Sequence, residues 1–573
     1  MGECDFDVIV IGAGLGGLLS AAQFLRRGQR VVVVERLTHP GGRFTAKTFH
    51  GAQVSTGAVH MLPFGSNGEL ASMLRVLGVP HRVHDAEVFA SFHVRGRQYA
   101  CRSLLQLAPV LGLRQFAELG RLGAEMFLLR PRPARAQLSF REWLLQRSSR
   151  ERSPELYAFF ERICHFGLSV DLADVAYAEV VAITKNMLRY GAPGIVDGGC
   201  AAVTGELERR VRETGGDLRM RHDVLEILSV EGAVAGVRVH DRATDTELTL
   251  RAPLVISNIG PEATQRLLTP LPADASAPPV STRPSSPTAR SESEPNSQRE
   301  ASGLKVHLLS DTSIIDHQGI MYCLDTERIA GIVQPSNSDR RLAPPGKHLL
   351  ITHQLMRGAD VNIEREAARA DLRRLFGDDF GTRIQILTMS QYRGEWPVNR
   401  VMQGMDVSPE TALAGLYQVG GAVKPSGYLM VEGVAQSVNL LLDLLERPGT
   451  PGTRAYQQTP SALAAPADIS PPRPLTTPTN GSTLTSPRAP TNGSALPSLP
   501  APGTSQQVRQ PPLAPLPAPG RGRGRGHPPS YRALHWLIKP PPPNRLSSRP
   551  VAIAVPGRTP DAPSDAPEPA ETR

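Results

Sequence analysis

The chain has 573 residues, of which 40% are hydrophobic and 20% charged, so it is long enough to form about two to four domains with buried cores. Its net charge of +9 is uneven, because residues 448–573 contain 13 Lys and Arg against 5 Asp and Glu, whereas residues 1–447 contain 50 against 49. The basic balance therefore gives no reason to assign nucleic-acid binding to residues 1–447.

The cysteines and the lengths of the apolar runs indicate the compartment in which the protein is expected. No C-x-x-C pair or metal-ligand spacing occurs, and the scattered thiols fit a reducing compartment as small packing residues: Cys4, Cys101, Cys164, Cys200 and Cys323. No apolar run reaches the roughly 18 to 20 residues needed to span a bilayer, and the first predicted strand begins too early to leave room for a signal peptide. We expect a cytoplasmic protein, attached to a membrane at most peripherally.

The first predicted elements are a strand, a glycine turn, a helix and a second strand. An apolar run at residues 8–11 is followed by three glycines spaced G-x-G-x-x-G, by a helical pattern that stops at Gly28, and by a second apolar run at 31–35. This order is typical of the first unit of a Rossmann-type dinucleotide-binding domain.

Several residues of this unit have the types that a dinucleotide site needs. Gly12 permits the turn, Gly14 lets a pyrophosphate approach the backbone at the positive helix N-terminus, and Gly17 lets helix and strand pack closely. Glu35 lies 23 residues after Gly12, where a carboxylate accepts the hydroxyls of a ribose. A glycine turn that binds nothing is the alternative. The predicted contacts of this unit are Gly12, Gly14, Leu15, Gly16, Gly17, Glu35 and Arg36.

A second glycine pair makes the prediction more specific. After Glu35, a loop contains Gly41, Gly42 and Arg43. Together with the first unit it resembles the amino-terminal signature of FAD-dependent oxidoreductases of the phytoene desaturase, carotenoid isomerase and amine oxidase superfamily. The resemblance implies FAD as cofactor, with Gly42 and Arg43 along its pyrophosphate, and a guanidinium beside glycine amides also suits a phosphate. A surface arginine after a glycine turn is the alternative.

Residues 55–60, which read Ser-Thr-Gly-Ala-Val-His, correspond to a region that passes close to the flavin ring in that superfamily. His60 is the candidate general acid or base, because the ordinary pKa of a histidine lies near neutrality. A single histidine after an apolar run is more often a hydrogen-bonded core residue, and we favour that interpretation.

Residues 67–190 read mainly as helices, with a capping box at 139–142, and are expected to form a substrate or cap region. Apolar segments here are flanked by four basic residues: Arg102, Arg114, Arg121 and Arg130. Such helices suit a membrane surface from which a lipid is admitted. An ordinary helical region with a solvated basic face is the alternative.

The next segment returns to the nucleotide-binding pattern. A helix through Leu207 and Val211 precedes a strand at 223–227, in which the resemblance implies that the backbone of Val224 contacts the FAD adenine. A hairpin at 233–247 and a strand at 254–258 follow, the latter expected to rejoin the sheet.

Residues 270–302 are rich in Pro, Ser, Ala and Thr, which predicts a disordered insertion. Strands near 303–309, 320–324, 348–354 and 384–387, with a helix at 363–376, predict a substrate-domain sheet. His307, His348 and His353 have no metal spacing and are expected to be structural.

The second strong signal lies at 415–434. It resembles the carboxy-terminal FAD motif of the phytoene desaturase group, in which a strand, a turn with Pro and Gly, and a helix lie under the flavin. The resemblance implies contacts from Gly420, Gly421, Val431 and Glu432, and free amides near 431–433 would stabilise negative charge on the reduced flavin. Many relatives carry an acid at the position of Gly421, so one side-chain contact is lost.

Residues 448–573 hold 30 of the 53 prolines and predict a disordered basic tail. The expected organisation is an α/β protein with a bipartite Rossmann-type FAD-binding domain and an interleaved α+β substrate domain. The predicted segments are 1–66, 191–269 and 411–447 for the FAD domain, 67–190 for the helical cap, 303–410 for the substrate domain, 270–302 for the insertion and 448–573 for the tail.

We expect an FAD-dependent oxidoreductase that desaturates, saturates or isomerises carbon-carbon bonds of a lipophilic isoprenoid or carotenoid-like substrate, with an electron acceptor that the sequence does not specify. A flavin amine oxidase is the first alternative, although the 5% aromatic content is low for a pocket with aromatic walls. The second alternative is a binding protein that acts through its tail and uses the flavin fold as structure or sensor.

Overall fold

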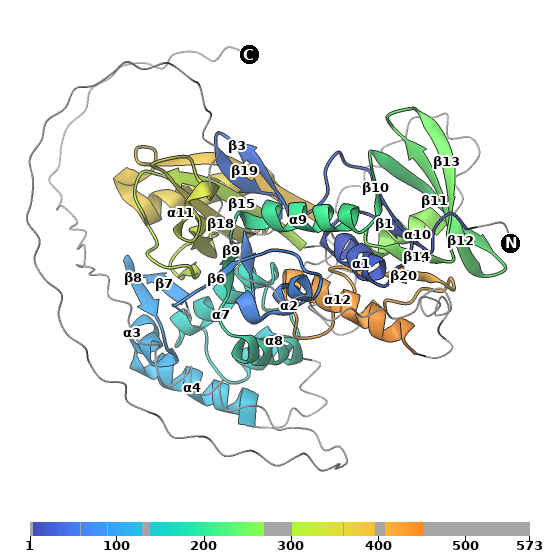
Figure 1. Ribbon diagram of the computed structural model, residues 1–573. Coiled ribbons are helices and arrows are strands. Elements are labelled where there is room, and N and C mark those ends of the chain that lie inside the picture. The colour runs from blue at the N-terminus through green and yellow to red at the C-terminus, as the bar shows by residue number, and fades with distance from the viewer. Residues whose placement is uncertain are drawn as a thin grey trace, which may run out of the picture.

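The computed structural model describes residues 4–57, 59–88, 90–128, 138–268, 301–358, 360–395, 407–447 and 450 (Figure 1). The predicted insertion up to residue 300, the predicted tail apart from residue 450, and Arg130 lie outside these residues. The described chain forms two large sheets with helices packed against both, which confirms the predicted α/β fold class.

The first sheet is parallel and has five strands in the order β10-β2-β1-β14-β20. Its strands come from three separate parts of the chain: β1 (Val8–Ile11) and β2 (Val31–Glu35), then β10 (Asp217–Met220) and β14 (Leu254–Ser257), then β20 (Leu416–Gln418). The predicted return of residues 254–258 to the nucleotide-binding sheet is therefore confirmed.

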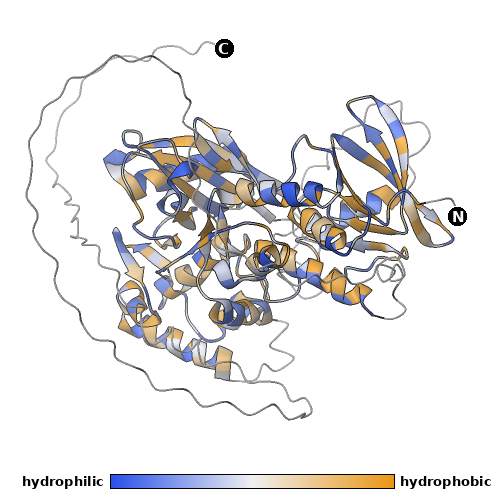
Figure 2. Ribbon diagram, in the orientation of Figure 1, coloured by the Kyte–Doolittle hydropathy of each residue, from blue (hydrophilic) through white to orange (hydrophobic). Residues whose placement is uncertain are grey.

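Both faces of this sheet are covered, which explains why β1 and β2 are continuously apolar. Val8 and Val10 face a core formed with four helices, α1 (Leu15–Arg26), α2 (Glu69–Val76), α9 (Gly199–Glu213) and α12 (Met430–Leu445). Ile9 and Ile11 face the antiparallel strands β11 (His222–Val230), β12 (Ala233–Asp241) and β13 (Thr246–Arg251). Figure 2 shows α12 as hydrophobic over most of its length, as expected for a helix buried against the sheet.

The second sheet has seven strands in the order β19-β15-β18-β17-β16-β7-β8. Their bounds are β7 (Ala90–Val94), β8 (Arg97–Cys101), β15 (Ala301–Ser310), β16 (Met321–Cys323), β17 (Gly331–Val333), β18 (His348–Leu355) and β19 (Ile384–Glu395). One face packs on α11 (Val361–Phe376), where Leu304 and Val306 meet Ala368 and Leu372. The other face belongs to the largest core cluster, shared with the helices of residues 104–190.

Those helices are α3 (Ala108–Leu111), α4 (Leu113–Leu128), α6 (Phe140–Leu145), α7 (Pro154–Gly167) and α8 (Tyr177–Tyr190), and the predicted capping box of Ser139 and Glu142 is confirmed. The mainly helical prediction missed the hairpin β7–β8, whose turn places Arg95 and Gly96 in the left-handed region at φ +53° and +68°. Its strands are stabilised by β16, more than two hundred residues away, which local sequence patterns do not reveal.

The remaining described elements are short. They are the strand pair β3 (Ala46–Phe49) and β4 (Ala52–Ser55), the small sheet of β5 (Met61–Leu62), β9 (Gly194–Val196) and β6 (Val83–Asp85), and the helix α10 (Pro261–Leu268). Among the described residues, no helix combines the length and hydropathy that crossing a membrane requires.

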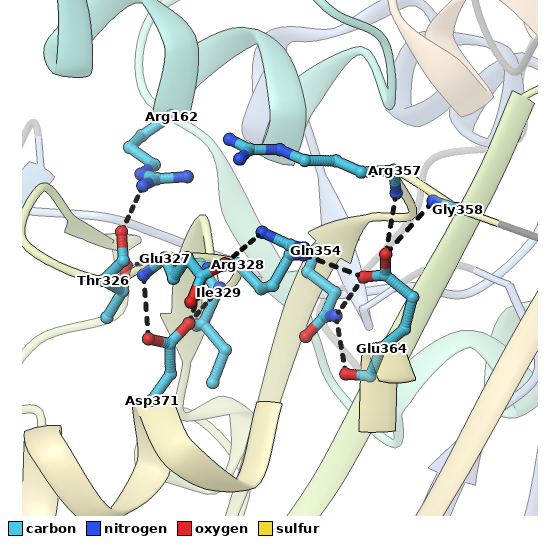
Figure 3. Close-up of polar contacts among 10 residues, drawn as sticks. All are labelled: Arg162, Thr326, Glu327, Arg328, Ile329, Gln354, Arg357, Gly358, Glu364 and Asp371. Atoms are coloured by element: carbon cyan, nitrogen blue, oxygen red, sulfur yellow. Dashed lines mark hydrogen bonds and ion pairs between the residues drawn. The ribbon is translucent and has the colours of Figure 1, made fainter. Parts of the chain in front are cut away.

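Two buried carboxylates fix α11 to the second sheet (Figure 3). Asp371, which is 1% exposed, accepts hydrogen bonds of 2.8, 2.6 and 2.9 Å from the backbone amides of Glu327, Arg328 and Ile329. Glu364 accepts bonds from the amides of Arg357 and Gly358 and from the side chains of Gln354 and Arg328. These bonds hold the β16–β17 loop and the end of β18 against the same helix.

Replacing Asp371 with Ala should lower the free energy of unfolding by about 3 kcal/mol or more, because three amides lose their buried acceptor. Urea denaturation measures the effect. Asp378→Ala, at an exposed position beyond the end of the same helix, is the matched control. Equal unfolding midpoints for the two variants would contradict this role of Asp371.

Candidate functional site

The candidate site lies at the carboxyl edge of the parallel sheet, where ligands bind in open α/β folds. Four neighbouring strands end there, and each is followed by a residue type suited to a ligand. Glu35 ends β2, the glycine turn begins at Gly12 after β1, Asn258 follows β14, and Gly420 follows β20. The fold therefore brings together predicted residues from both ends of the chain.

The glycine turn is required by the backbone itself. Gly12 has φ +92°, and a Cβ atom on Gly17 would lie 2.0 Å from the carbonyl oxygen of Gly12, a backbone clash that no side-chain movement relieves. Leu15 is 5% exposed and begins α1, so its side chain belongs to the core rather than to the ligand edge. Gly14 precedes the helix as its N-cap residue and has no side chain to cover the first amides.

Asn258 is the functional candidate that the sequence analysis missed. A Cβ atom added at Gly14, Gly16 or Gly420 would lie 2.6, 2.6 or 2.9 Å from its side-chain amide. In the part of the chain that the structure describes, this amide makes no hydrogen bond. A polar group with open donors and acceptor, surrounded by bare backbone, is a cradle suited to a polar ligand. Its position directly after a buried strand was the available signal.

The Glu35 carboxylate accepts two hydrogen bonds from backbone amides that the sequence did not predict. It is 8% exposed, accepts a 2.7 Å bond from the amide of Ala13, and accepts a 2.9 Å bond from the amide of Leu37. These bonds hold the glycine turn against the end of β2 and leave further lone pairs for ribose hydroxyls. Arg36, beside it, is exposed.

The glycine pair at 41–42 lies against the first turn. The amide of Gly41 donates to the carbonyl of Ala13 at 2.8 Å, and a Cβ atom on Gly42 would lie 3.5 Å from Cα of Gly14. Arg43 is exposed at this edge. The structure therefore brings the two predicted phosphate loops together.

Val224 lies at the other end of the site. Its strand β11 begins just after Arg221, whose amide donates to the carbonyl of Leu37 in the loop that follows Glu35. A register shift immediately after Val224 interrupts the pairing with β12. This location is consistent with the expected contact with an adenine, which stays a prediction.

The carboxy-terminal motif differs in part from expectation. Gly420 has φ +113°, and its amide donates to the hydroxyl of Ser437 on α12 at 2.8 Å, while the carbonyl of Gly421 accepts from Lys424. The amides of Glu432 and Gly433 are not free, because both donate to the carbonyl of Leu429. The expectation of free amides at these two positions is wrong, whereas the cofactor contacts expected of Val431 and Glu432 stay predictions.

Glu432 has a structural role that the sequence did not predict. Its carboxylate is fully buried and accepts from the amides of Phe64 at 3.2 Å and Leu70 at 2.9 Å, which ties α12 to the start of α2. Burial raises the pKa of this carboxyl to about 7, and the two amide bonds oppose that shift. The sequence alone does not distinguish a flavin contact from this structural role, because an acid in the first turn of a helix is favourable in both.

His60 has the geometry of a core residue. It is fully buried with φ +61°, its Nε2 donates to the carbonyl of Gln53 at 2.8 Å, and its Nδ1 accepts from the amide of Cys200 at 3.1 Å. Burial lowers its pKa to about 4, so the ring is neutral near pH 7. Both nitrogens are occupied, which favours the core interpretation over acid-base catalysis.

A buried lysine joins the second sheet to the site. Lys305 on β15 is 2% exposed, and its ammonium donates to the carbonyls of Ser55, Thr56 and Gly57 at 3.2, 3.0 and 2.9 Å. Burial lowers its pKa to about 8. Thr56 in turn donates to the carbonyl of Gly42 at 3.1 Å. Lys305 therefore fixes the segment expected to lie beside the flavin ring.

The residues around Lys305 form one polar face on β15, β18 and β19. His307 follows two residues later, His353 is the partner of Lys305 in register on β18, and Tyr392 lies beside them on β19. Burial lowers the pKa of both histidines to about 3, with the Lys305 charge as a further cause. The buried Nδ1 of His307 has no hydrogen-bond partner in the described chain. Strands β15 and β18 contain no Asp or Glu, and the one acidic residue of β19 is Glu395, which is in register with Ala301 at the start of β15.

Acidic pH should destabilise the fold between about pH 6.5 and 4. A histidine whose folded pKa is lowered binds its proton only in the unfolded chain over this interval, so stability falls as pH falls. For His60 the loss is on the order of 3 kcal/mol. Thermal unfolding across this pH range should show a shallower dependence for His60→Gln than for the control His50→Gln at an exposed position. Parallel curves would contradict the assignment.

Replacing Glu35 with Ala should weaken FAD binding by about tenfold or more, because two backbone amides and the ribose lose a charged acceptor. Flavin titration followed by fluorescence measures the affinity. Glu231→Ala, at an exposed turn between β11 and β12, is the matched control. Equal affinities for the two variants would show that Glu35 does not hold the adenosine.

Comparisons with known proteins identify the family and the fold of the chain. A family model described as flavin containing amine oxidoreductase matches residues 15–437. An uncharacterised protein of Methanocaldococcus jannaschii is 31% identical over 430 residues, which cover 75% of this chain and 96% of that protein. A limonene dehydrogenase chain of Castellaniella defragrans is 24% identical over 302 residues (45% and 52%), and prolycopene isomerase of Arabidopsis thaliana is 23% identical over 281 residues (42% and 46%). The chain thus spans about half the length of the last two.

Solved structures show the same architecture. An oxidoreductase of Methanosarcina mazei has a TM-score of 0.65 and 31% identity, and the match covers 76% of this chain and all of that one. A putrescine oxidase bound to putrescine has a TM-score of 0.52 and 17% identity, with 77% and 99% covered, and supports the fold alone.

The residues present fit the cofactor. Bare glycine backbone surrounds the side-chain amide of Asn258, which makes no hydrogen bond within the described chain, and Glu35 lies where the adenosine is expected. Gly12, Gly14, Gly16, Glu35, Gly42, Asn258 and Gly420 would hold it. The chain belongs to the flavin-containing amine oxidoreductase family and is an oxidoreductase that uses FAD.

Proposed function

We propose that the protein transfers hydride or electrons between FAD and a carbon-carbon bond of an apolar, isoprenoid-like substrate, by desaturation, saturation or isomerisation. The polar face of β15, β18 and β19 carries this proposal. Around Lys305 it presents an ammonium and neutral imidazoles, and β15 and β18 contain no Asp or Glu, so these two strands offer no counter-charge for a cationic amine.

Buried aromatic residues of the core cluster lie beside this polar face. Phe166 packs edge-on against Tyr322 and His353 with ring centroids 5.9 Å apart in both pairs, and Phe92 stacks on Tyr322 at 5.6 Å. Such apolar surroundings exclude water and favour a hydrocarbon. FAD, when bound, supplies the redox chemistry, while these residues orient an apolar substrate and Lys305 holds the 55–57 segment in place.

The relatives support the same class of substrate. Limonene and prolycopene, which appear in the names of two of them, are isoprenoid hydrocarbons. The family description and the putrescine oxidase fold keep amine oxidation as the alternative, which the same experiment tests.

If the enzyme acts as a desaturase, anaerobic mixing of the FAD-loaded protein with isoprenoid alkenes should bleach the oxidised flavin. If it acts as a saturase, the alkenes should reoxidise flavin that has been reduced with dithionite. The visible absorption spectrum follows both reactions. Bleaching by primary or secondary amines, with no response to any alkene in either direction, would replace this proposal by amine oxidation.

A truncated chain of residues 1–447 is the control for the tail. The family match ends at residue 437, so the truncated chain should keep its turnover. The opposite outcome is a full-length protein that shows no turnover but binds a partner, and a truncated chain that no longer binds it. That outcome would favour the tail-mediated binding function.

We also propose that the cap region contacts membranes peripherally. Leu105 is 69% and Leu113 is 80% exposed, and they flank α3 near Arg102 and Arg114. Exposed leucines beside arginines suit the interface of an anionic bilayer.

Replacing Leu105 and Leu113 together with Asp should reduce co-sedimentation with vesicles that contain phosphatidylserine, because the apolar contact is lost and negative charge is added. Val230→Asp is the control, since Val230 is 60% exposed but lies on the distant β11. Equal sedimentation of the double variant and the control would exclude this surface.

A further inference from the structure

Arg162 is a buried cation that the proposed chemistry does not use. It lies on α7, is 5% exposed, and donates from Nη2 to the carbonyl of Thr326 (Figure 3). Its Nε and Nη1 atoms are buried without a hydrogen-bond partner in the part of the chain that the structure describes. Leaving two donors of a buried guanidinium unpaired is costly, so such a group calls for a partner of opposite charge.

The carboxylates near Arg162 do not supply that partner. Asp371 is occupied by three backbone amides, and Glu364 by the contacts described above. Glu161, the neighbour of Arg162 in sequence, forms an ion pair with Arg150 at 3.1 Å. These three carboxylates are thus already paired with other groups.

A second guanidinium approaches the same position. Arg357 follows β18, is exposed, and extends its side chain toward Arg162 (Figure 3). No hydrogen bond or ion pair of this side chain occurs within the described chain, and its charge is one of the causes that lower the pKa of Arg162, after burial. Two guanidinium groups that face one another repel unless an anion lies between them.

We propose that Arg162 and Arg357 bind an oxyanion, a carboxylate or a phosphate, at one end of an otherwise apolar substrate. The unpaired Nε and Nη1 of Arg162 point along different edges of the guanidinium and can each donate to an oxygen of such a group, and Arg357, being exposed, supplies further donors from the solvent side. The substrate is then an isoprenoid acid or phosphate rather than a neutral hydrocarbon. This assignment rests on the proposed function for its apolar part.

The fold connects the oxyanion site to the flavin side. Phe166 lies four residues after Arg162, on the same face of α7, and its ring packs against His353. His353 is paired in register with Lys305, which holds residues 55–57. The proposed substrate, anchored at Arg162, therefore lies along Phe166 and His353 in the direction of residues 55–57.

The first test is calorimetric titration of the FAD-loaded protein with inorganic phosphate. Wild-type protein should bind phosphate saturably at one site, and Arg357→Ala and Arg162→Gln should each weaken binding by about tenfold or more. Arg373→Ala, at an exposed arginine on α11, should bind like wild type. Arg357→Ala changes an exposed residue, so it remains informative if Arg162→Gln does not fold. Absence of saturable binding, or equal binding by Arg357→Ala, would overturn the proposal.

The second test compares farnesoic acid, farnesyl phosphate and farnesol by the change each causes in the flavin spectrum. The more potent of the two anionic compounds should change the flavin spectrum at about tenfold lower concentration than farnesol, and it identifies the preferred oxyanion. In Arg357→Ala this compound should be no more potent than farnesol. Equal potency of all three with wild type would overturn the oxyanion assignment while leaving the proposed function intact. Phosphate binding without any response of the flavin to isoprenoids would instead contradict the proposed function.

Discussion

The structure depends on the close packing of three chain segments at the carboxyl edge of one parallel sheet. The glycine turn after β1, Asn258 after β14 and Gly420 after β20 approach so closely that a single added Cβ atom at Gly14, Gly16 or Gly420 would lie less than 3 Å from the Asn258 amide. Only glycine backbone permits this approach. The same bare backbone leaves amides and the Asn258 side chain available to a pyrophosphate-containing cofactor.

A second constraint joins the two large sheets. The Lys305 ammonium donates to three consecutive carbonyls about 250 residues earlier in the chain, and burial lowers its pKa to about 8 without removing its charge near pH 7. Because those carbonyls belong to the segment next to Gly42, the seven-stranded sheet and the carboxyl edge of the parallel sheet are held by the same contact. The neutral histidines around Lys305 leave its ammonium as the charged group of this polar face.

The sequence predicted best what local patterns determine. The first strand-turn-helix-strand unit, the helix at α12 and most strands of the second sheet follow from periodicity and glycine spacing over a few residues. The β7–β8 hairpin was missed because its pairing with β16 is remote in sequence. Asn258, Lys305 and the contact of Glu432 with the start of α2 were missed for the same reason, since each acts on segments that only the tertiary fold brings together.

The most direct test of the central claim is a crystal structure of the protein purified with FAD. The account predicts one FAD per chain, with the ribose at Glu35, the pyrophosphate against Gly14 and Gly42, and the flavin ring beside residues 55–57 and the start of α12. A protein that takes up no FAD, or that binds it away from the glycine edge, would contradict the account.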